Sequence, residues 1–247
     1  GVLSGCDVVD QIIISPADYQ AALEKIEELE TELSNQYTLF SELSLEVVKS
    51  NVMLYTTCRS LTGISRKGGQ GSGVIVDEDQ SSYYVLTNNH VVYCEPNYPR
   101  RSYEVTDYKM NSYNGEILFF DADFDLALVK FPKSTELLVL EFAEENPKAS
   151  ETVIAIGQPE GQINAITFGE VLRYTQIICS TCDPLVSNVT FDCILHSAAI
   201  SKGNSGGMLI NRDKKIVGIN TFGSENNGAA VPVERIMEFL ENNEYPI

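Results

Sequence analysis

The stretch Gly203-Asn204-Ser205-Gly206-Gly207 places one serine in a glycine-rich run. Two earlier runs carry a histidine and then an aspartate. The first is Thr87-Asn88-Asn89-His90-Val91-Val92, and the second is Asp125-Leu126-Ala127-Leu128-Val129-Lys130. A serine hydroxyl is a poor nucleophile at neutral pH, and it needs a base within reach and donors for the oxyanion that forms. The three runs together contain residue types that meet this need.

The glycines around Ser205 suit an oxyanion site. Gly203 and Gly206 can take a positive φ without a Cβ penalty, so neighbouring amides can turn toward one point. We expect the oxyanion site at Gly203, Asn204 and Ser205, with the N–H groups of Gly203 and Ser205 as donors. Taken alone, the same pentapeptide is equally typical of a plain glycine-rich turn.

Only two histidines are available as a base, His90 and His196. His90 follows the β-branched and aromatic run 83–87, which predicts a strand, so it lies where a firmly held side chain can reach a cleft. His196 lies inside the apparent strand 189–199, nine residues before Ser205, and is interpreted as structural.

Asp125 begins an apolar run typical of a buried strand, so its carboxylate needs a partner. An imidazole N–H would satisfy it and would fix the histidine tautomer. Asp121 and Asp123 lie nearby, but a calcium loop is disfavoured because no glycine follows at the turn position and Pro132 stands where a bidentate Glu is needed. The order His90, Asp125, Ser205 is that of chymotrypsin-type triads.

Further runs extend the likeness to a known family. They are Gly71 to Val76, Ile156 to Pro159, Ser197 to Gly207, Val217 to Thr221 and Ala229 to Pro232. With the histidine and aspartate runs, they resemble the trypsin-like serine proteases of the HtrA/DegP group over roughly residues 50 to 240. The resemblance implies a mainly β fold of two six-stranded antiparallel β-barrels with the active site between them.

The N-terminal sequence patterns and the family resemblance together divide the chain into three parts. Residues 1–14 would be a lipobox remnant and linker, 15–50 a helical coiled-coil or stalk segment, and 51–247 the protease domain. Within the last, we expect a first barrel at about 51–137, a second at about 150–232 and a helix at about 232–242. Family members commonly carry a PDZ domain after the protease. None is expected here, and Ser201-Lys202 replaces the family's Asn-Pro.

Composition narrows the partners. The chain has 247 residues, is 43% hydrophobic and carries a formal charge of −18. Such an acidic surface disfavours nucleic acid as a partner. The family resemblance implies polypeptide substrates, and we expect no cofactor or metal.

The first residues predict an exported protein. Leu3-Ser4-Gly5-Cys6 resembles a bacterial lipobox, in which Cys6 would be lipidated and would attach the protein to a membrane. We therefore expect an extracytoplasmic location, at the bacterial cell surface or in the periplasm, where disulfides persist.

Cysteine spacing suggests two groups. Cys58 and Cys94 could form a bridge that holds the histidine region. Cys193 could pair with Cys179 or Cys182, and free thiols or a zinc site that includes His196 are the alternatives. A bridge in this second group would order a loop that the resemblance places beside the active site.

The segment after Ser15-Pro16 predicts a long helix, with Ser15 as cap and Pro16 at its first position. A seam with 3-4 spacing then follows, in which every residue except Gln36 is apolar: Tyr19, Ala22, Ile26, Leu29, Leu33, Gln36, Phe40, Leu43 and Val47. Such a narrow seam favours self-association into a homo-oligomer, and packing against the first barrel is the alternative. Ten acids and two lysines in residues 1–50 oppose close assembly.

Together these features predict a serine endopeptidase of extracytoplasmic quality control or processing. Ser205 would attack the peptide carbonyl, His90 would transfer the proton, and Asp125 would orient His90. Substrate-binding residues are expected at Ala199, Ile200, Asn220, Thr221 and Phe222. Ala199 stands six residues before Ser205, where an acid would select Lys or Arg, so small or medium apolar residues are expected before the cut. The alternative is a surface-anchored, protease-shaped binding module with little or no turnover.

Overall fold

The computed structural model describes residues 15–158, 164–177, 182–224 and 227–246. The chain divides into two units, one up to Ser41 and the other from Glu42 onward. Residues 1–14, which contain the lipobox-like Cys6, lie outside the described residues. No helix in the described ranges combines the length and apolar composition that a membrane span requires.

Helix α1 (Pro16–Leu45) begins where the sequence predicts it. Ser15 Oγ accepts a hydrogen bond from the Asp18 N–H at 3.1 Å, which satisfies one free donor of the first turn. The helix ends earlier than the expected boundary at residue 50. Val47–Ser50 forms a 3-10 helix, η1, whose valines are buried and lead directly into the first strand.

The first barrel is a closed antiparallel sheet with the strand order β1-β2-β3-β6-β5-β4. Its strands are β1 (Asn51–Arg59), β2 (Ser65–Glu78), β3 (Ser82–Thr87), β4 (Arg100–Thr106), β5 (Ser112–Asp121) and β6 (Leu126–Pro132). A short helix, α2 (Asn89–Val92), follows β3. Alternate apolar side chains such as Val52, Leu54 and Ile75 fill the barrel interior.

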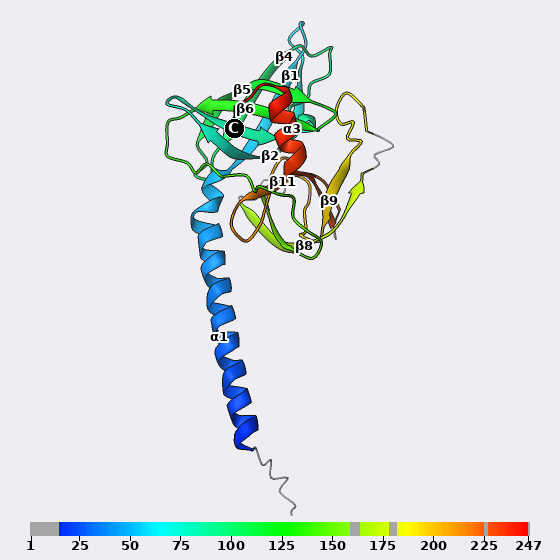
Figure 1. Ribbon diagram of the computed structural model, residues 1–247. Helices are drawn as coiled ribbons and strands as arrows, with labels where there is room; N and C mark the ends of the chain where they lie inside the picture. The colour runs from blue at the N-terminus through cyan, green and yellow to red at the C-terminus, as the bar shows by residue number, and fades with distance from the viewer. Residues whose placement is uncertain (1–14, 159–163, 178–181, 225–226, 247) are drawn as a thin grey trace, which may run out of the picture. The chain divides into compact units, whose positions relative to one another are not determined.

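The second barrel repeats this topology, because its closed order is β10-β11-β12-β9-β8-β7. Its strands are β7 (Thr152–Gly157), β8 (Ala165–Gln176), β9 (Asp192–His196), β10 (Met208–Ile210), β11 (Ile216–Ser224) and β12 (Asn227–Pro232). Figure 1 shows the strands of both barrels in the part of the chain that follows α1. The predicted fold of two six-stranded antiparallel barrels after a long helix is confirmed.

Helix α3 (Val233–Asn242) closes the described chain and packs with its apolar face inward. Its Phe239 ring lies 5.2 Å from Phe119 of β5 and 5.9 Å from Phe124, measured between ring centroids. Phe124 immediately precedes Asp125, so the helix that leaves the second barrel supports the turn of the first barrel that holds this aspartate.

Candidate active site

His90 lies in the first turn after β3, on the four-residue helix α2. Its side chain is 25% exposed, whereas the flanking Asn89 and Val91 are buried. Thr56 Oγ1 of β1 donates to the Val91 carbonyl at 2.8 Å, which ties this helix to the barrel wall. The imidazole is therefore held by its neighbours but remains accessible from solvent.

Asp125 is fully buried in the turn between β5 and β6, with φ at +51°. Its Oδ2 accepts a hydrogen bond from His90 Nδ1 at 2.8 Å, and its Oδ1 accepts one from the His90 backbone N–H at 3.0 Å. Thr221 Oγ1 of β11 donates to the same carboxylate. Because Nδ1–H points at Asp125, Nε2 is left with its lone pair free to act as a base.

Asn88 fixes the aspartate turn from the other side. Its Nδ2 donates to the Asp125 carbonyl at 2.9 Å. This bond holds the backbone of a residue in the left-handed region, which is sparsely populated for residues other than glycine. Two neighbours in sequence, Asn88 and His90, thus hold the main chain and the side chain of one aspartate.

Ser205 lies in a tight loop between β9 and β10, and the first barrel holds that loop. Ser72 of β2 donates from its N–H to the Ser205 carbonyl at 2.7 Å and from Oγ to the Gly203 carbonyl at 2.7 Å. Gly206 has φ at +83°, and a Cβ added there would lie 2.1 Å from the Ser72 carbonyl oxygen. Only glycine fits this approach between the two barrels.

The Ser205 hydroxyl donates to the Thr221 carbonyl at 3.2 Å. Across the described residues it makes no hydrogen bond to His90. The backbone N–H groups of Gly203 and Ser205 likewise have no hydrogen-bond partner in the described part of the chain. Gly203 has φ at +104°. The two N–H groups that have no partner among the described residues, those of Gly203 and Ser205, lie on either side of Asn204 in this loop.

Ile200 packs over the paired glycines Gly223 of β11 and Gly228 of β12. It is 5% exposed, and a Cβ added at Gly223 would lie 2.3 Å from its Cγ1. Ala199 is exposed, and its carbonyl accepts a hydrogen bond from Thr167 Oγ1 at 2.8 Å. The side chain that covers these two glycines is therefore that of Ile200, while Ala199 is held through its backbone.

Among the described residues, backbone pairing on the edge of β11 beside Ser205 ends at Asn220. Strand β10 pairs with β11 only as far as Met208↔Ile219, whereas β12 pairs with the opposite edge as far as Ser224. The Phe222 ring is stacked against His90 with centroids 6.2 Å apart. A cavity of about 330 Å³ adjoins Phe222 and is lined by residues that include Gln176, Pro184, Asn188 and Thr190.

The loop that borders this cavity rests on the elements that carry His90 and Asp125. Asn89 Nδ2 donates to the Val186 carbonyl at 2.8 Å. Asn188 Nδ2 donates to Asp123 Oδ1 at 2.6 Å. The residue before His90 and the residue two before Asp125 are thus both bound to this loop.

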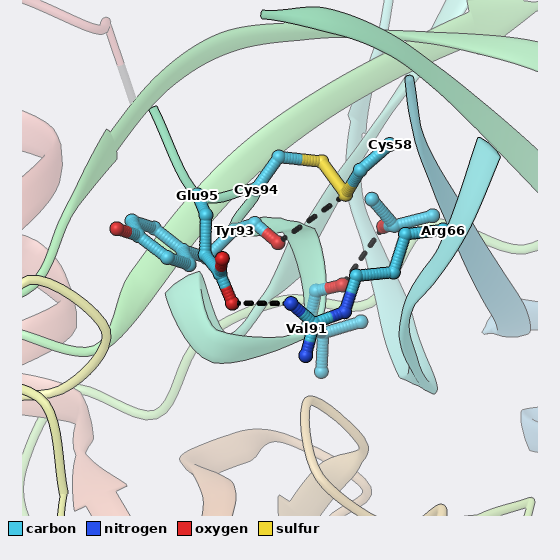
Figure 2. Close-up of a disulfide and its surroundings, with 7 residues drawn as sticks. Cys58, Arg66, Val91, Tyr93, Cys94 and Glu95 are labelled. Carbon is cyan, nitrogen blue, oxygen red and sulfur yellow. Dashed lines mark hydrogen bonds and ion pairs between the residues drawn. A yellow bond between two sulfur atoms is a disulfide. The ribbon is translucent and has the colours of Figure 1, made fainter. Parts of the chain in front are cut away.

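A disulfide joins Cys58 of β1 to Cys94, four residues after His90, with the Cα atoms 5.7 Å apart. Figure 2 shows this bridge beside Val91 and Tyr93. It also shows the ion pair between Arg66 of β2 and Glu95, the residue after Cys94. The pairing is the one that the sequence suggested for the histidine region.

The expected bridge to Cys193 is wrong. Cys193 is a free, fully buried thiol, and it lies on the face of β9 opposite Ile194, which belongs to the core of the second barrel. Burial raises its pKa to about 12, with the charges of Asp125 and Asp192 adding to the rise. Cys182 is instead disulfide-bonded elsewhere, and Cys179 lies outside the described residues. No group of three His, Cys, Asp or Glu side chains in the described ranges could hold a metal ion.

His196 is a core residue, in line with its structural interpretation. Its Nε2 lies 3.1 Å from Asn220 Oδ1, and Asn220 Nδ2 donates to the Met208 carbonyl at 3.0 Å. The amide orientation of Asn220 therefore places the imidazole hydrogen on Nε2. Burial lowers the pKa of His196 to about 4, although the bond to Asn220 acts in the opposite direction.

The sequence did not predict the roles of several residues that support this site. Ser72 and Asn88 lie within motifs that were noted, but their partners are far away in the chain. Thr221 was expected to contact substrate, yet its hydroxyl binds Asp125 and its carbonyl accepts the Ser205 hydroxyl. The available signal was the placement of buried small polar residues inside apolar strands, since such groups require partners.

Comparison with known proteins agrees with this geometry. The chain is 33% identical to serine protease Do-like HtrA of Bacillus subtilis over 78% of this chain and 43% of that protein. It is 33% identical to serine protease HTRA4 of Mus musculus over 85% of this chain and 42% of that protein. A probable periplasmic serine protease do/HhoA-like of Haemophilus influenzae is 29% identical over 69% of this chain and 37% of that protein.

The chain thus spans less than half the length of these relatives. The family described as "Trypsin-like peptidase domain" matches residues 71–219, which include His90, Asp125 and Ser205. The two barrels, their order along the chain and this match agree, and the chain belongs to the trypsin-like peptidase domain family.

Proposed function

We propose that this protein is a serine endopeptidase in which Ser205, His90 and Asp125 act together. The observation that carries the proposal is the buried Asp125 carboxylate, which accepts hydrogen bonds from His90 Nδ1 at 2.8 Å and from Thr221 Oγ1. A fully buried carboxylate needs such donors, and this set fixes the histidine with Nε2 directed away from it. The serine protease relatives support the same reaction class.

The chemistry begins with a rotation of the Ser205 side chain. Its hydroxyl leaves the Thr221 carbonyl and hydrogen-bonds to His90 Nε2, an alignment that often forms only in the substrate complex. Oγ then attacks the peptide carbonyl carbon while its proton moves to Nε2. The buried Asp125 stabilises the resulting imidazolium without taking its proton.

The N–H groups of Gly203 and Ser205 receive the oxyanion. Both lack partners in the described structure, so neither must break a hydrogen bond when charge develops on the substrate oxygen. His90 next gives its proton to the departing amine, which leaves an acyl-enzyme on Ser205. Water, deprotonated by His90, attacks the ester carbonyl and releases the acid product while Ser205 regains its proton.

The substrate binds as an extended strand along the open edge of β11. Main-chain pairing at residues 221–223 would place the scissile carbonyl beside Ser205. Because Ile200 covers the paired glycines Gly223 and Gly228, the side chain before the cut would meet an apolar surface with little depth. Small or medium apolar residues fit this surface, and Ala199 supplies no charge for Lys or Arg.

The setting is extracytoplasmic, where the enzyme would take part in protein quality control or processing. The disulfide between Cys58 and Cys94 suits an oxidising compartment. One relative carries the word periplasmic in its name, which points the same way. A lipid at Cys6 would add attachment to the membrane.

Labelling with a fluorophosphonate probe tests the proposal, because the probe reacts only with an activated serine. The wild type should label, and both Ser205→Ala and His90→Ala should lose labelling. Ser201→Ala is the matched control, since Ser201 is an exposed serine four residues earlier, and it should label like the wild type. A folded wild-type protein that does not label would favour the binding module without turnover.

A further inference from the structure

Helix α1 carries a stripe of apolar side chains that face solvent. Seven of them are at least 42% exposed. They are Tyr19, Leu23, Ile26, Leu29, Leu33, Tyr37 and Phe40. Helices in proteins gain most of their stability by packing an apolar face, and an exposed apolar surface of this extent marks an interaction site.

The spacing along the stripe identifies the kind of partner. Tyr19, Ile26, Leu33 and Phe40 recur every seven residues, as the a positions of a heptad do. Ala22, Leu29 and Gln36 lie three residues after Tyr19, Ile26 and Leu33, at the d positions of the heptad. A period of 3.5 residues fits another helix of the same period, which a second copy of α1 supplies.

Charges beside the seam select a parallel arrangement. Lys25 falls at a g position and Glu30 at the e position five residues later. In a parallel, in-register coiled coil, each g residue faces the e residue of the next heptad on the partner helix. The acids at g, Asp18 and Glu32, then face Leu23 and Tyr37 of the other copy, so these positions bring no two acids together.

The remaining acids of the helix agree with this arrangement. Glu24 occupies an f position, Glu27 a b position, and Glu28 and Glu42 c positions, all on the outer face. Lys25 now pairs with Glu28 of its own helix at 2.7 Å, with both side chains more than 60% exposed. Such an exposed pair is weak, so Lys25 is free to exchange it for a contact across the seam.

We infer that α1 assembles with α1 of a second copy of this chain in a parallel, in-register coiled coil. This inference goes beyond the proposed peptidase chemistry, because it concerns only the helix that precedes the barrels. It makes the protein a homo-oligomer whose protease domains are joined through their N-terminal helices.

Sedimentation equilibrium of the full chain over a wide concentration range tests the inference. The wild type should populate dimers or higher oligomers. Leu29→Glu puts a charge into the seam and should weaken self-association by at least about 100-fold. Thr31→Glu makes the same charge change at an outer f position, and it should shift the association constant by less than about threefold.

A charge exchange tests the direction and register. Lys25→Glu alone and Glu30→Lys alone should each weaken association by about fivefold at low salt, since like charges then face each other. The double variant should restore it. Within one helix these residues lie on different faces, so restoration requires a contact between chains.

Three results would overturn the inference. They are a wild type that stays monomeric at every concentration, equal effects of Leu29→Glu and Thr31→Glu, and a double charge variant that is not restored. A monomer whose α1 amides resist hydrogen exchange would point to packing of the helix on its own chain. Fluorophosphonate labelling reports Ser205 independently, so failure here and failure of the proposed chemistry can be told apart.

Discussion

Loss of the Cys58–Cys94 disulfide should lower the free energy of unfolding by about 4 kcal/mol. The two cysteines are 36 residues apart in sequence. Closing a loop of this size removes about 13 cal/mol/K of entropy from the unfolded chain, which is about 4 kcal/mol at 25 °C. Both cysteines are buried, at 4% and 2% exposed. The double replacement Cys58→Ala with Cys94→Ala therefore leaves the solvent-exposed surface of the protein almost unchanged.

Urea denaturation followed by near-ultraviolet circular dichroism measures this loss. The chain has twelve tyrosines and no tryptophan, so the tyrosine signal reports packing in the barrels. With a slope of about 2 kcal/mol/M, the midpoint should fall by about 2 M. Cys193→Ala is the control, because it removes a buried sulfur without removing a bridge.

The reasoning fails if the double variant unfolds within about 1 kcal/mol of the wild type. It also fails if the double variant loses no more stability than Cys193→Ala, because the loss would then reflect packing alone. Adding a reductant should lower the urea midpoint of the wild type more than that of the double variant, because the double variant has no Cys58–Cys94 bridge to lose.

Three further changes test other contacts. Thr221→Val removes a hydrogen bond to the buried Asp125, so kcat/KM should fall by about 10- to 100-fold with Thr221→Ser largely restoring it; an unchanged rate would mean that the contact does not support His90. The unfolded state binds a proton on His196 near pH 6.5 but the folded state only near pH 4. Stability should therefore fall as pH drops through this window, by at most about 3 kcal/mol, and His196→Gln should flatten the urea midpoint between these pH values. Ile200→Ala should uncover the paired glycines Gly223 and Gly228, so a peptide library should show a shift of about tenfold toward larger residues before the cut; an unchanged profile would place the selectivity elsewhere.

Sequence patterns predicted the architecture because the motifs occur in one order and each marks a strand end or a turn. His90 after β3 and Asp125 before β6 are local signals of this kind. The Thr221 contact with Asp125 escaped prediction, since it joins residues 96 apart and depends on how the barrels meet. The Ser205 hydroxyl likewise depends on a side-chain rotation that no sequence pattern encodes.

The cysteine error has a geometric origin. Neighbouring positions in a strand face opposite sides of a sheet, so the pairing of Cys193 depends on which face it takes. In β9 Ile194 belongs to the core of the second barrel, so Cys193 lies on the opposite face, which is also buried. Sequence proximity to Cys182 could not reveal this, because one residue of register exchanges the two faces. Similarly, the heptad seam runs on past Leu45 in sequence, but buried Val47 and Val48 turn the chain into β1.

Ser72 of the first barrel holds the loop of Ser205, and Thr221 of the second barrel binds Asp125. A chain that is still being synthesised therefore contains His90 and Asp125 for some time before Ser205 and Thr221 are made. Synthesis from the end of β6 to the end of β11 takes roughly 5 to 20 s at the usual rate. Under the proposed chemistry, the nascent protein has no complete triad during this interval and would not cut itself or its neighbours. Activity would begin only when the second barrel closes on the first, so the two-barrel design would delay proteolysis until folding is complete.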